Sequence, residues 1–270
     1  MVNKDTQLCI SLSSRPSNFG TTLHNAAYAA LGLNFVYKAF GISDLAGALT
    51  GVRALNIRGC SVSMPFKEVV LPLLDELDET ACVIGAVNTV VNETGRLKGY
   101  NTDAVGARKA LEFIKAQPGE SVLLIGAGGV ARAILFALRQ LGFSHVRATN
   151  RDLKKVQFLN SILPCEAVPW EERCTVGTDL LINATSVGMS PDLQQSPIEA
   201  EFLRQTRAVM DVVVSPMETR LIREARSLGR EVAPGYLMSL EQAIAQFQLY
   251  TGVVPPRALL ESKMRELQSQ

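Results

Sequence analysis

The feature that most constrains the fold of this chain is a glycine-rich turn between an apolar segment and an amphipathic one. The apolar residues 121–125 are followed by Gly126-Ala127-Gly128-Gly129-Val130-Ala131, which fits the pattern G-x-G-x-x-G/A, and then by a helical stretch that Gly142 ends. In this pattern the first glycine permits a tight turn, the second lets a pyrophosphate approach the backbone, and the helix N-terminus offers N–H groups and partial positive charge. A further strand at residues 145–149 completes the unit, so the sequence predicts a dinucleotide-binding domain. The alternative is a tight turn of an α/β domain that binds no ligand.

The end of the second strand of this domain predicts which dinucleotide is bound. An acidic side chain about 20 residues after the turn would hydrogen-bond the ribose 2′-hydroxyl, whereas an arginine accommodates a 2′-phosphate. The chain has Asn150, Arg151 and Lys155 in this region, and they favour NADP over NAD. Asp152 is the evidence against this choice unless it caps the next helix, and Arg151 could instead be a solvated surface charge.

Apolar segments alternate between strand-like and helix-like periods along the whole chain, which is typical of an α/β protein. We expect two α/β domains. Residues 1–101, completed by the C-terminal helices at 238–270, form one domain, and residues 102–237 form the doubly wound dinucleotide-binding domain. The final helix is expected to pack on the first domain, because the chain offers it no other apolar partner.

Turn and capping residues predict where several elements begin and end. Ser43 is expected to cap a helix at residues 44–55. The turn residues Asn92-Glu93-Thr94-Gly95 are expected to join two strands as a hairpin. The apolar spacing also predicts a helix over residues 152–163 and a last long helix over residues 238–250.

Composition excludes several classes of protein. Apolar residues make up 47% of the 270 residues and the formal net charge is +1, so the chain can bury a core and lacks a broad basic surface for nucleic acid. No apolar run reaches the roughly 18–20 residues that span a bilayer, and the polar N-terminus predicts no signal peptide. The five cysteines show no C-x-x-C spacing and there are only two histidines, so no metal site is expected. We expect a cytoplasmic, soluble protein.

Three polar clusters follow strands of the first domain. They are Ser61-Val62-Ser63-Met64-Pro65-Phe66-Lys67, Gly85-Ala86-Val87-Asn88-Thr89 and Asn101-Thr102-Asp103. Ligands of open α/β sheets gather where strands end, so the three clusters could face one site. Taken singly, Lys67 could be a surface lysine and Asp103 a helix cap.

In this order and spacing, the motifs of the chain resemble those of the shikimate dehydrogenase family. That family carries N-V-T-x-P-F-K, G-A-V-N-T, N-T-D-G-x-G, G-A-G-G-A-x-R, N-R-T and N-A-T-x-x-G-M. The counterparts here are S-V-S-M-P-F-K, G-A-V-N-T, N-T-D-A-V-G, G-A-G-G-V-A-R, N-R-D and N-A-T-S-V-G-M. The resemblance implies a two-domain enzyme with a central cleft that interconverts 3-dehydroshikimate and shikimate with NADP, in the chorismate pathway of aromatic amino acid biosynthesis.

The resemblance also implies roles for individual residues. Lys67 and Asp103 would be the catalytic pair, since reducing a ketone needs a hydride from the nicotinamide and a proton from a nearby acid. The lysine can be that acid, and a carboxylate beside it favours the charged ammonium. The expected substrate contacts are Asn18, Thr22, Ser61, Ser63, Asn88 and Gln242. The expected cofactor contacts are Gly126, Ala127, Gly128, Gly129, Val130, Ala131, Asn150, Arg151, Lys155, Thr185, Ser186, Val212, Gly235 and Met238.

The chain departs from the family pattern at substrate contacts. The S-x-S pair that holds the substrate carboxylate in the family aligns with Asn18 and Gly20, the first Asn of N-V-T is Ser61, and a Tyr after the fifth strand is Val214. Three lost neutral hydrogen bonds amount to about 2–4 kcal/mol, or roughly 30- to 1,000-fold in kcat/KM. Arg15 could compensate by binding a carboxylate in bidentate fashion, or it could be an exposed loop charge. We expect weakened or altered specificity, with quinate or an aminated analogue as alternative substrates.

Two other functions stay open. One is a regulatory module that binds NADP and a metabolite without turnover, although an intact Lys67 and Asp103 argue against it. The other is a related two-domain dehydrogenase acting on a folate or an amino acid, which a shikimate-displaceable ligand would exclude. In every case we expect a small-molecule ligand, no nucleic-acid or membrane partner, and a monomer or homodimer.

Overall fold

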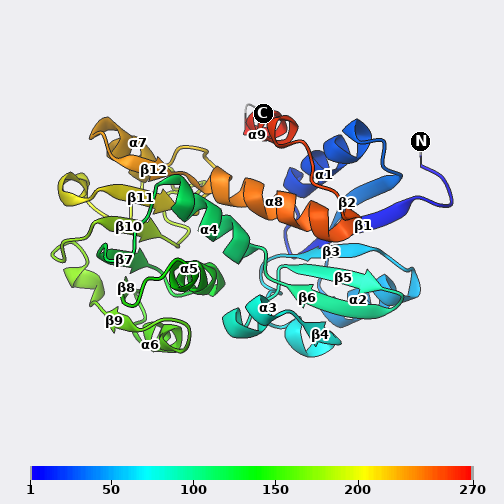
Figure 1. Ribbon diagram of the computed structural model, residues 1–270, viewed down its shortest axis with the longest axis horizontal. Coiled ribbons are helices and arrows are strands. Elements are labelled where there is room, and N and C mark those ends of the chain that lie inside the picture. The colour runs from blue at the N-terminus through cyan, green and yellow to red at the C-terminus, as the bar shows by residue number, and fades with distance from the viewer. Residues whose placement is uncertain (1, 269–270) are drawn as a thin grey trace. The chain divides into compact units, whose positions relative to one another are not determined.

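The computed structural model of the protein describes residues 2–268, and the chain forms two compact units. The first unit contains the residues up to Thr102 together with those from Leu240 onward, and the second runs from Asp103 to Ser239. In the colours of Figure 1, the first unit therefore combines blue and cyan N-terminal elements with red C-terminal ones. The sequence placed the two boundaries after residues 101 and 237.

The first unit is built on a mixed six-stranded sheet with the strand order β2-β1-β3-β5-β6-β4. Its strands are β1 (Gln7–Ser13), β2 (Phe35–Gly41), β3 (Gly59–Val62), β4 (Glu76–Leu77), β5 (Thr89–Glu93) and β6 (Arg96–Tyr100). Strand β1 pairs in parallel with β2 and β3, whereas β5 pairs antiparallel with β3 and β6. The helices are α1 (Phe19–Ala30), α2 (Leu45–Ala54), the 3-10 helix η1 (Leu71–Leu73), α3 (Glu79–Ile84) and α9 (Arg257–Gln268). Helix α9 packs against α1, and α8 (Gly235–Thr251) contributes its residues from Leu240.

The central strand β1 is buried on both of its faces. Ile10 packs in a hydrophobic cluster with Leu49 and Val52 of α2. Cys9, its neighbour along the strand, points to the opposite face and lies against Tyr28 of α1. Because helices cover both faces, this strand is a run of apolar residues rather than an alternating one, which is usual for strands in parallel pairing.

The hairpin predicted from the turn residues is confirmed. Strands β5 and β6 pair antiparallel from Thr89↔Tyr100 to Glu93↔Arg96. At the turn Thr94 and Gly95 have φ values of 53° and 92°, the left-handed conformation that tight hairpin turns use. The side chain of Asn92 holds the turn by accepting a hydrogen bond from the Gly95 N–H at 2.8 Å.

The predicted cap of α2 is wrong by one residue. Asp44, not Ser43, is the N-cap, and its Oδ1 accepts a hydrogen bond from the Gly47 N–H at 2.9 Å. Both residue types make good caps. Asp44 has the extended backbone that a cap needs and places its carboxylate three residues before the amide that it satisfies.

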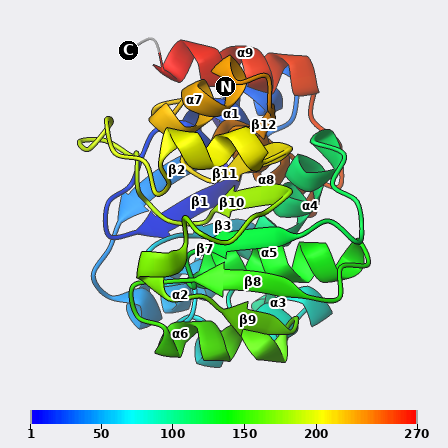
Figure 2. The same cartoon turned by 90° about the vertical axis from the view of Figure 1, so that its left-hand side faces the viewer.

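The second unit is a parallel six-stranded sheet with the order β12-β11-β10-β7-β8-β9. Figure 2 shows these strands side by side. The strands are β7 (Val122–Ile125), β8 (Val146–Thr149), β9 (Cys165–Ala167), β10 (Leu180–Asn183), β11 (Ala208–Asp211) and β12 (Glu231–Ala233). The helices are α4 (Asp103–Phe113), α5 (Gly129–Gln140), α6 (Lys154–Gln157), α7 (Arg220–Ser227), the start of α8, and the 3-10 helices η2 (Phe158–Ser161), η3 (Trp170–Glu172) and η4 (Ala200–Gln205). This is the doubly wound Rossmann order, whose direction reverses between β7 and β10.

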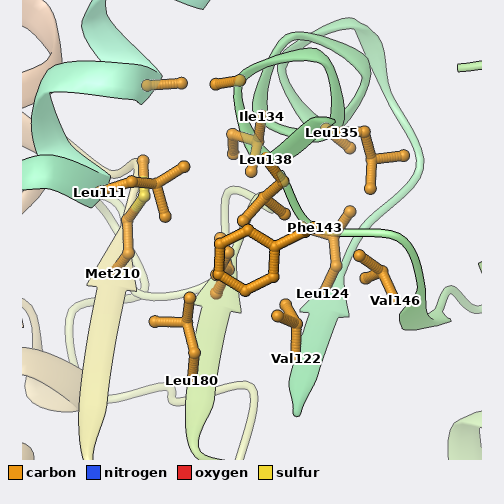
Figure 3. Close-up of a cluster of buried hydrophobic side chains, with 14 of the residues drawn as sticks. Leu111, Val122, Leu124, Ile134, Leu135, Leu138, Phe143, Val146, Leu180 and Met210 are labelled. Atoms are coloured by element: carbon orange, nitrogen blue, oxygen red, sulfur yellow. The ribbon is translucent and has the colours of Figure 1, made fainter. Parts of the chain in front are cut away.

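The core of the second unit lies on both faces of its sheet. On one face, Leu111 of α4 and Leu138 of α5 pack on Leu124 and Met210, as Figure 3 shows. On the other face, Leu123 packs in a separate cluster with residues of β10, β11 and α7. The central strands β7, β10 and β11 are therefore apolar at nearly every position, and β10 and β11 end in the polar residues Asn183 and Asp211.

The single helix predicted over residues 152–163 is wrong. The segment forms the short helix α6 and the 3-10 helix η2, and then the unpredicted strand β9. Only Val156, Leu159 and the residues just before Pro164 are buried, so the apolar contact suffices for short turns. The Asn160 side chain accepts a hydrogen bond from the Cys165 N–H at 2.7 Å, which begins the strand.

Two further properties concern membranes and metals. Among residues 2–268, no helix combines the length and the apolar character that a bilayer-spanning helix requires. Within the same range, no three histidine, cysteine, aspartate or glutamate side chains gather closely enough to hold a metal ion.

Candidate active site

The loop that carries Lys67 is held by the sheet and the core of the first unit. The carbonyl of Lys67 accepts a hydrogen bond from the Val87 N–H at 2.8 Å, which joins the first polar motif to the second. Phe66, next to the lysine, is buried in the hydrophobic cluster of the first unit. The backbone at Lys67 is therefore fixed, while the side chain is only half-buried.

Asn88 joins the second polar motif to the third. The buried side-chain Oδ1 of Asn88 accepts hydrogen bonds from the Thr102 N–H at 2.9 Å, the Thr102 hydroxyl at 3.1 Å and the Thr89 hydroxyl at 2.8 Å. Its carbonyl accepts from the Val62 N–H of the first motif at 2.8 Å. Asp103, the first residue of α4, directly follows Thr102 and is buried. Three motifs that are far apart in the sequence are thus tied through one asparagine.

The start of α1 carries the largest departure from the family pattern. Asn18 is exposed at the N-cap position, and its side chain does not cap the helix. A Cβ atom at Gly20 would lie 3.0 Å from Cε1 and 3.1 Å from the hydroxyl oxygen of Tyr37. The space next to the Gly20 backbone is therefore occupied by a phenol. Thr22, one turn along, is half-buried, and Arg15 in the preceding loop is exposed.

Tyr37 belongs to a buried aromatic stack on this side of the sheet. Its ring lies 4.5 Å from that of His24 at an interplanar angle of 13°. Burial raises the pKa of the Tyr37 hydroxyl, which also hydrogen-bonds with the side chains of Ser61 and Ser11. Burial lowers the pKa of His24 to about 4, so this imidazole is neutral at physiological pH and is no acid or base for catalysis.

Gln246 of α8 reaches the same region and was not among the predicted site residues. Its Nε2 donates to the Thr89 hydroxyl at 3.0 Å and approaches the Ser61 hydroxyl at 3.5 Å. Gln242, one turn earlier, is half-buried, and its side chain makes no hydrogen bond with the part of the chain that the structure describes. The spacing of four residues puts both glutamines on one helix face, so the spacing was the signal that could have found Gln246. Phe247 and Tyr250 of the same helix are buried.

The glycine turn of the second unit has the geometry that a bound pyrophosphate requires. Gly126 has a φ of +112°, and a Cβ there would lie 2.9 Å from the Ala184 carbonyl oxygen. A Cβ at Gly128 would meet nothing within 4 Å, so that backbone is open to a ligand. Helix α5 begins at Gly129 without a side-chain cap, and Ala131 is buried beneath it. The residues present therefore fit a dinucleotide at this helix N-terminus.

The end of β8 carries the residues expected to select the cofactor. Arg151 and Lys155 are both exposed. Asn150 donates to the carbonyl of Asp152 at 2.9 Å, and Asp152 accepts from the Lys154 N–H at 3.2 Å. The carboxylate of Asp152 thus accepts from the first residue of α6, but the N-cap of that helix is Leu153, so the prediction that Asp152 is the N-cap is wrong.

The remaining cofactor candidates lie at the ends of β10, β11 and β12. Thr185 is half-buried and Ser186 is exposed in the loop after β10, and Val212 directly follows β11. Gly235, the first residue of α8, lies so close to the backbone after β11 that a Cβ would collide with it. Met238 is almost fully buried and packs in the core of the second unit.

One unit has a doubly wound sheet with an open glycine turn, and the other has a clustered set of polar motifs. A chain with both units defines a class. That class is the NAD(P)-dependent dehydrogenases. Three comparisons with known proteins narrow it further.

The family model described as the shikimate dehydrogenase substrate binding domain matches residues 17–90. The shikimate dehydrogenase-like protein of Haemophilus influenzae is 42% identical over 262 residues, covering 96% of each chain. The shikimate dehydrogenase (NADP(+)) of Moorella thermoacetica is 40% identical, covering 90% of this chain and 87% of its own. The structure of quinate dehydrogenase from Corynebacterium glutamicum in complex with NAD is similar with a TM-score of 0.90 at 30% identity, covering 97% of this chain and 99% of that one. The chain belongs to the shikimate dehydrogenase family. The family, the α/β fold class and the enzyme class predicted from the sequence are confirmed.

Proposed function

We propose that this protein catalyses the NADP-dependent interconversion of shikimate and 3-dehydroshikimate, or of a close cyclic hydroxy acid, with Lys67 and Asp103 as the catalytic pair. The observation that carries the proposal is the joining of three polar motifs through the hydrogen bonds of Lys67 to Val87 and of Asn88 to Thr102. Residues whose types suit proton donation and hydroxyl recognition are thereby held in one well-ordered region of the first unit. Membership of the family supports the same reaction.

The chain's own residues provide binding and a proton. NADP, when bound, supplies or accepts the hydride at its nicotinamide ring. The Lys67 ammonium donates the proton to the substrate carbonyl oxygen during reduction, and Asp103 orients that ammonium. Ser61, Ser63 and Asn88 hydrogen-bond the substrate from β3 and the loops beside it. Asn18, Thr22 and Gln242 complete the set of substrate contacts.

The second unit would bind NADP at its adenine end and at its nicotinamide end. The turn from Gly126 to Ala131 binds the pyrophosphate with its N–H groups, as the fit of its open backbone indicates. The ribose 2′-phosphate is met by the half-buried Asn150 and by Arg151 and Lys155, which are exposed and carry two positive charges. Thr185, Ser186, Val212, Gly235 and Met238 are proposed to line the nicotinamide end.

The substrate specificity is proposed to be weaker than, or different from, that of relatives with the complete family motifs. Gly20 stands where the family has a serine hydroxyl, and the Tyr37 phenol fills the adjacent space. Ser61 stands where the family has an asparagine, and it lies within reach of the Gln246 amide. Both changes concern the region expected to bind the substrate carboxylate, so quinate or an aminated analogue is the second candidate substrate.

Steady-state rates with shikimate and quinate, each with NADP and NAD, test the proposal. The expected result is shikimate oxidation with NADP at a kcat/KM roughly 30- to 1,000-fold below that of the Moorella relative assayed in parallel. Lys67→Ala should abolish turnover and leave the NADP dissociation constant unchanged, while the exposed-helix control Lys109→Ala should leave both unchanged. NADP binding without turnover of any cyclic hydroxy acid would instead indicate a regulatory module.

A further inference from the structure

Asn183 and Asp211 face each other at the carboxyl ends of two neighbouring strands. They are the last residues of β10 and β11 and form a register pair. Both side chains are fully buried at 0% exposure. A buried carboxylate is costly unless its oxygens are well satisfied, so its presence at this sheet edge calls for a physical reason.

The Asp211 carboxylate is satisfied entirely by neutral donors. Its Oδ1 accepts from Asn183 Nδ2 at 3.0 Å and from the Val213 N–H at 3.0 Å, and its Oδ2 accepts from the Thr219 hydroxyl at 2.6 Å. The backbone of Val212 adds a further hydrogen bond. The groups that face it from β10, from the start of α7 and from the end of its own strand thus carry no charge. Because burial outweighs these hydrogen bonds, the pKa of Asp211 is raised to about 6.

Asn183 connects Asp211 to the loop after β10, because it hydrogen-bonds both. Its Oδ1 accepts from the Thr185 hydroxyl at 2.6 Å and from the Thr185 N–H at 3.1 Å. With Oδ1 engaged on Thr185, the amide cannot rotate without losing two hydrogen bonds, so its NH₂ group must point at Asp211. The Thr185 hydroxyl in turn accepts from the Val187 N–H at 3.2 Å.

A second route leads from Asp211 to the start of α8. The hydrogen bond to Val213 fixes the backbone after β11, and Gly235 lies directly against the backbone of Val212 and Val213. A side chain at Gly235 would collide with that backbone, so the start of α8 is in close contact with the segment after β11. Asp211 is therefore connected to three chain segments that carry proposed cofactor contacts: the loop after β10, the backbone after β11 and the start of α8.

These segments lie at the carboxyl edge of the half of the sheet that contains β10, β11 and β12. In doubly wound folds the dinucleotide binds outside the carboxyl ends of the strands, at the point where the strand order reverses. The adenine end is assigned to β8, on the other side of that point, by Asn150 and Arg151. The nicotinamide end then belongs to β10 and β11.

We propose that Asp211 is a positioning residue for the nicotinamide half of the cofactor, acting through Asn183 and Val213 on the segments that carry Thr185, Val212 and Gly235. This inference rests on the proposed function, since it needs NADP to bind at the glycine turn. Four donors, from Asn183, Val212, Val213 and Thr219, converge on this one carboxylate. An asparagine has one acceptor oxygen instead of two, so with almost no change of volume its NH₂ group would take the place of an oxygen that accepts in the wild type.

The decisive experiment compares NADP with adenosine 2′,5′-bisphosphate, which contains the adenine end and lacks the nicotinamide. Asp211→Asn should weaken NADP binding by about tenfold, as expected for a lost hydrogen bond to a charged group. It should lower kcat with shikimate and leave the dissociation constant of adenosine 2′,5′-bisphosphate unchanged. Thr219→Ser, which keeps the hydroxyl, should behave like the wild type, and Thr219→Val should show a smaller loss in the same direction.

The pH dependence of NADP binding is a second measurement, and it should not change if Asp211 has only a structural role. The affinity of the wild type for NADP should fall as the pH drops through about 6, because protonation removes acceptor capacity from Asp211. The 2′-phosphate of NADP titrates in the same range, with a pKa near 6, so the profile of Asp211→Asn with the same ligand is subtracted. The wild type should retain a pH dependence after this subtraction.

Equal weakening of both ligands in Asp211→Asn, or unchanged binding of both, would overturn the proposal. If Asp211→Asn does not fold, Thr219→Val carries the same comparison; it removes the hydroxyl donor to Asp211 together with the side-chain cap of α7. A wild type that binds NADP but turns over no substrate would refute the proposed function alone, because the two binding comparisons would still decide the role of Asp211.

Discussion

Gly20 of α1 lies directly against the ring and hydroxyl of Tyr37, 3.0–3.3 Å from where its Cβ would be. Tyr37 cannot move away easily, because the side chain of Asn25 hydrogen-bonds both its N–H at 2.8 Å and its carbonyl at 2.9 Å. The loss of the family serine and the placement of this phenol are therefore linked. This link yields the first prediction.

Gly20→Ser, which restores the family residue, should lower the free energy of unfolding by about 1–3 kcal/mol, the usual cost of overpacking. It should not raise kcat/KM for shikimate. Adding Tyr37→Leu removes both the ring and the hydroxyl that the new side chain would meet, so the double variant should be more active on shikimate than Tyr37→Leu alone. Urea unfolding and steady-state kinetics of the three variants measure this. A stable, faster Gly20→Ser enzyme would show that the phenol does not restrict this position.

His24 should make the stability of the protein depend on pH. Its pKa is lowered to about 4 in the folded state, whereas the unfolded chain binds the proton near 6.5. The stabilisation is therefore fully present above pH 6.5 and is lost as the pH falls toward 4, by about 3 kcal/mol in total. His24→Phe keeps the stacking and should flatten this part of the profile in urea unfolding between pH 7.5 and 4.5.

The exposed His145 offers the matched control. His145→Gln replaces a histidine without touching the aromatic stack and should leave the pH profile of unfolding as it is in the wild type. A His24→Phe profile as steep as that of the wild type would show that other groups carry the dependence.

Gln242 and Gln246 should respond differently to removal of their amides. Gln246→Ala takes a donor from the buried Thr89 hydroxyl and should lower the free energy of unfolding by about 1–3 kcal/mol. Gln242→Ala changes a half-buried side chain and should leave stability within about 0.5 kcal/mol, while raising KM for shikimate. Thermal unfolding and substrate titration distinguish the two. Unchanged KM in Gln242→Ala would remove that residue from the proposed site.

Arg151 should set the preference for NADP. Arg151→Ala removes a charge-assisted contact to the 2′-phosphate and should raise KM for NADP by roughly 10- to 100-fold, with KM for NAD nearly unchanged. Lys154 is another exposed cation nearby, and Lys154→Ala is the control. It should change the ratio of KM for NADP to KM for NAD much less than Arg151→Ala does. A ratio unaffected by Arg151→Ala would show that this side chain is only a surface charge.

Local patterns were sufficient for much of the fold. The turn residues 92–95 join β5 and β6 in the predicted hairpin, and the glycine turn leads into α5 as its motif indicated. The predictions failed where local signals were balanced or weak. Ser43 and Asp44 are both good caps, and the three-residue strand β9 has little apolar pattern of its own because its edge position needs only one covered face.

Some features of the candidate site could likewise be predicted from the sequence, and others could not. Apolar periodicity, turn residues and motif order act over short stretches of chain, so they were enough to assign two α/β units, a nucleotide-binding turn and the family of the protein. Contacts such as Gln246 with Thr89, 157 residues apart, or Asp211 with Asn183, 28 residues apart, follow no short-range rule. The folded chain alone decided that Gly20 would be filled by a phenol and that a buried carboxylate would join the ends of β10 and β11. The physical reason is that such hydrogen bonds form only when separate elements have already been brought together by burial of their apolar faces.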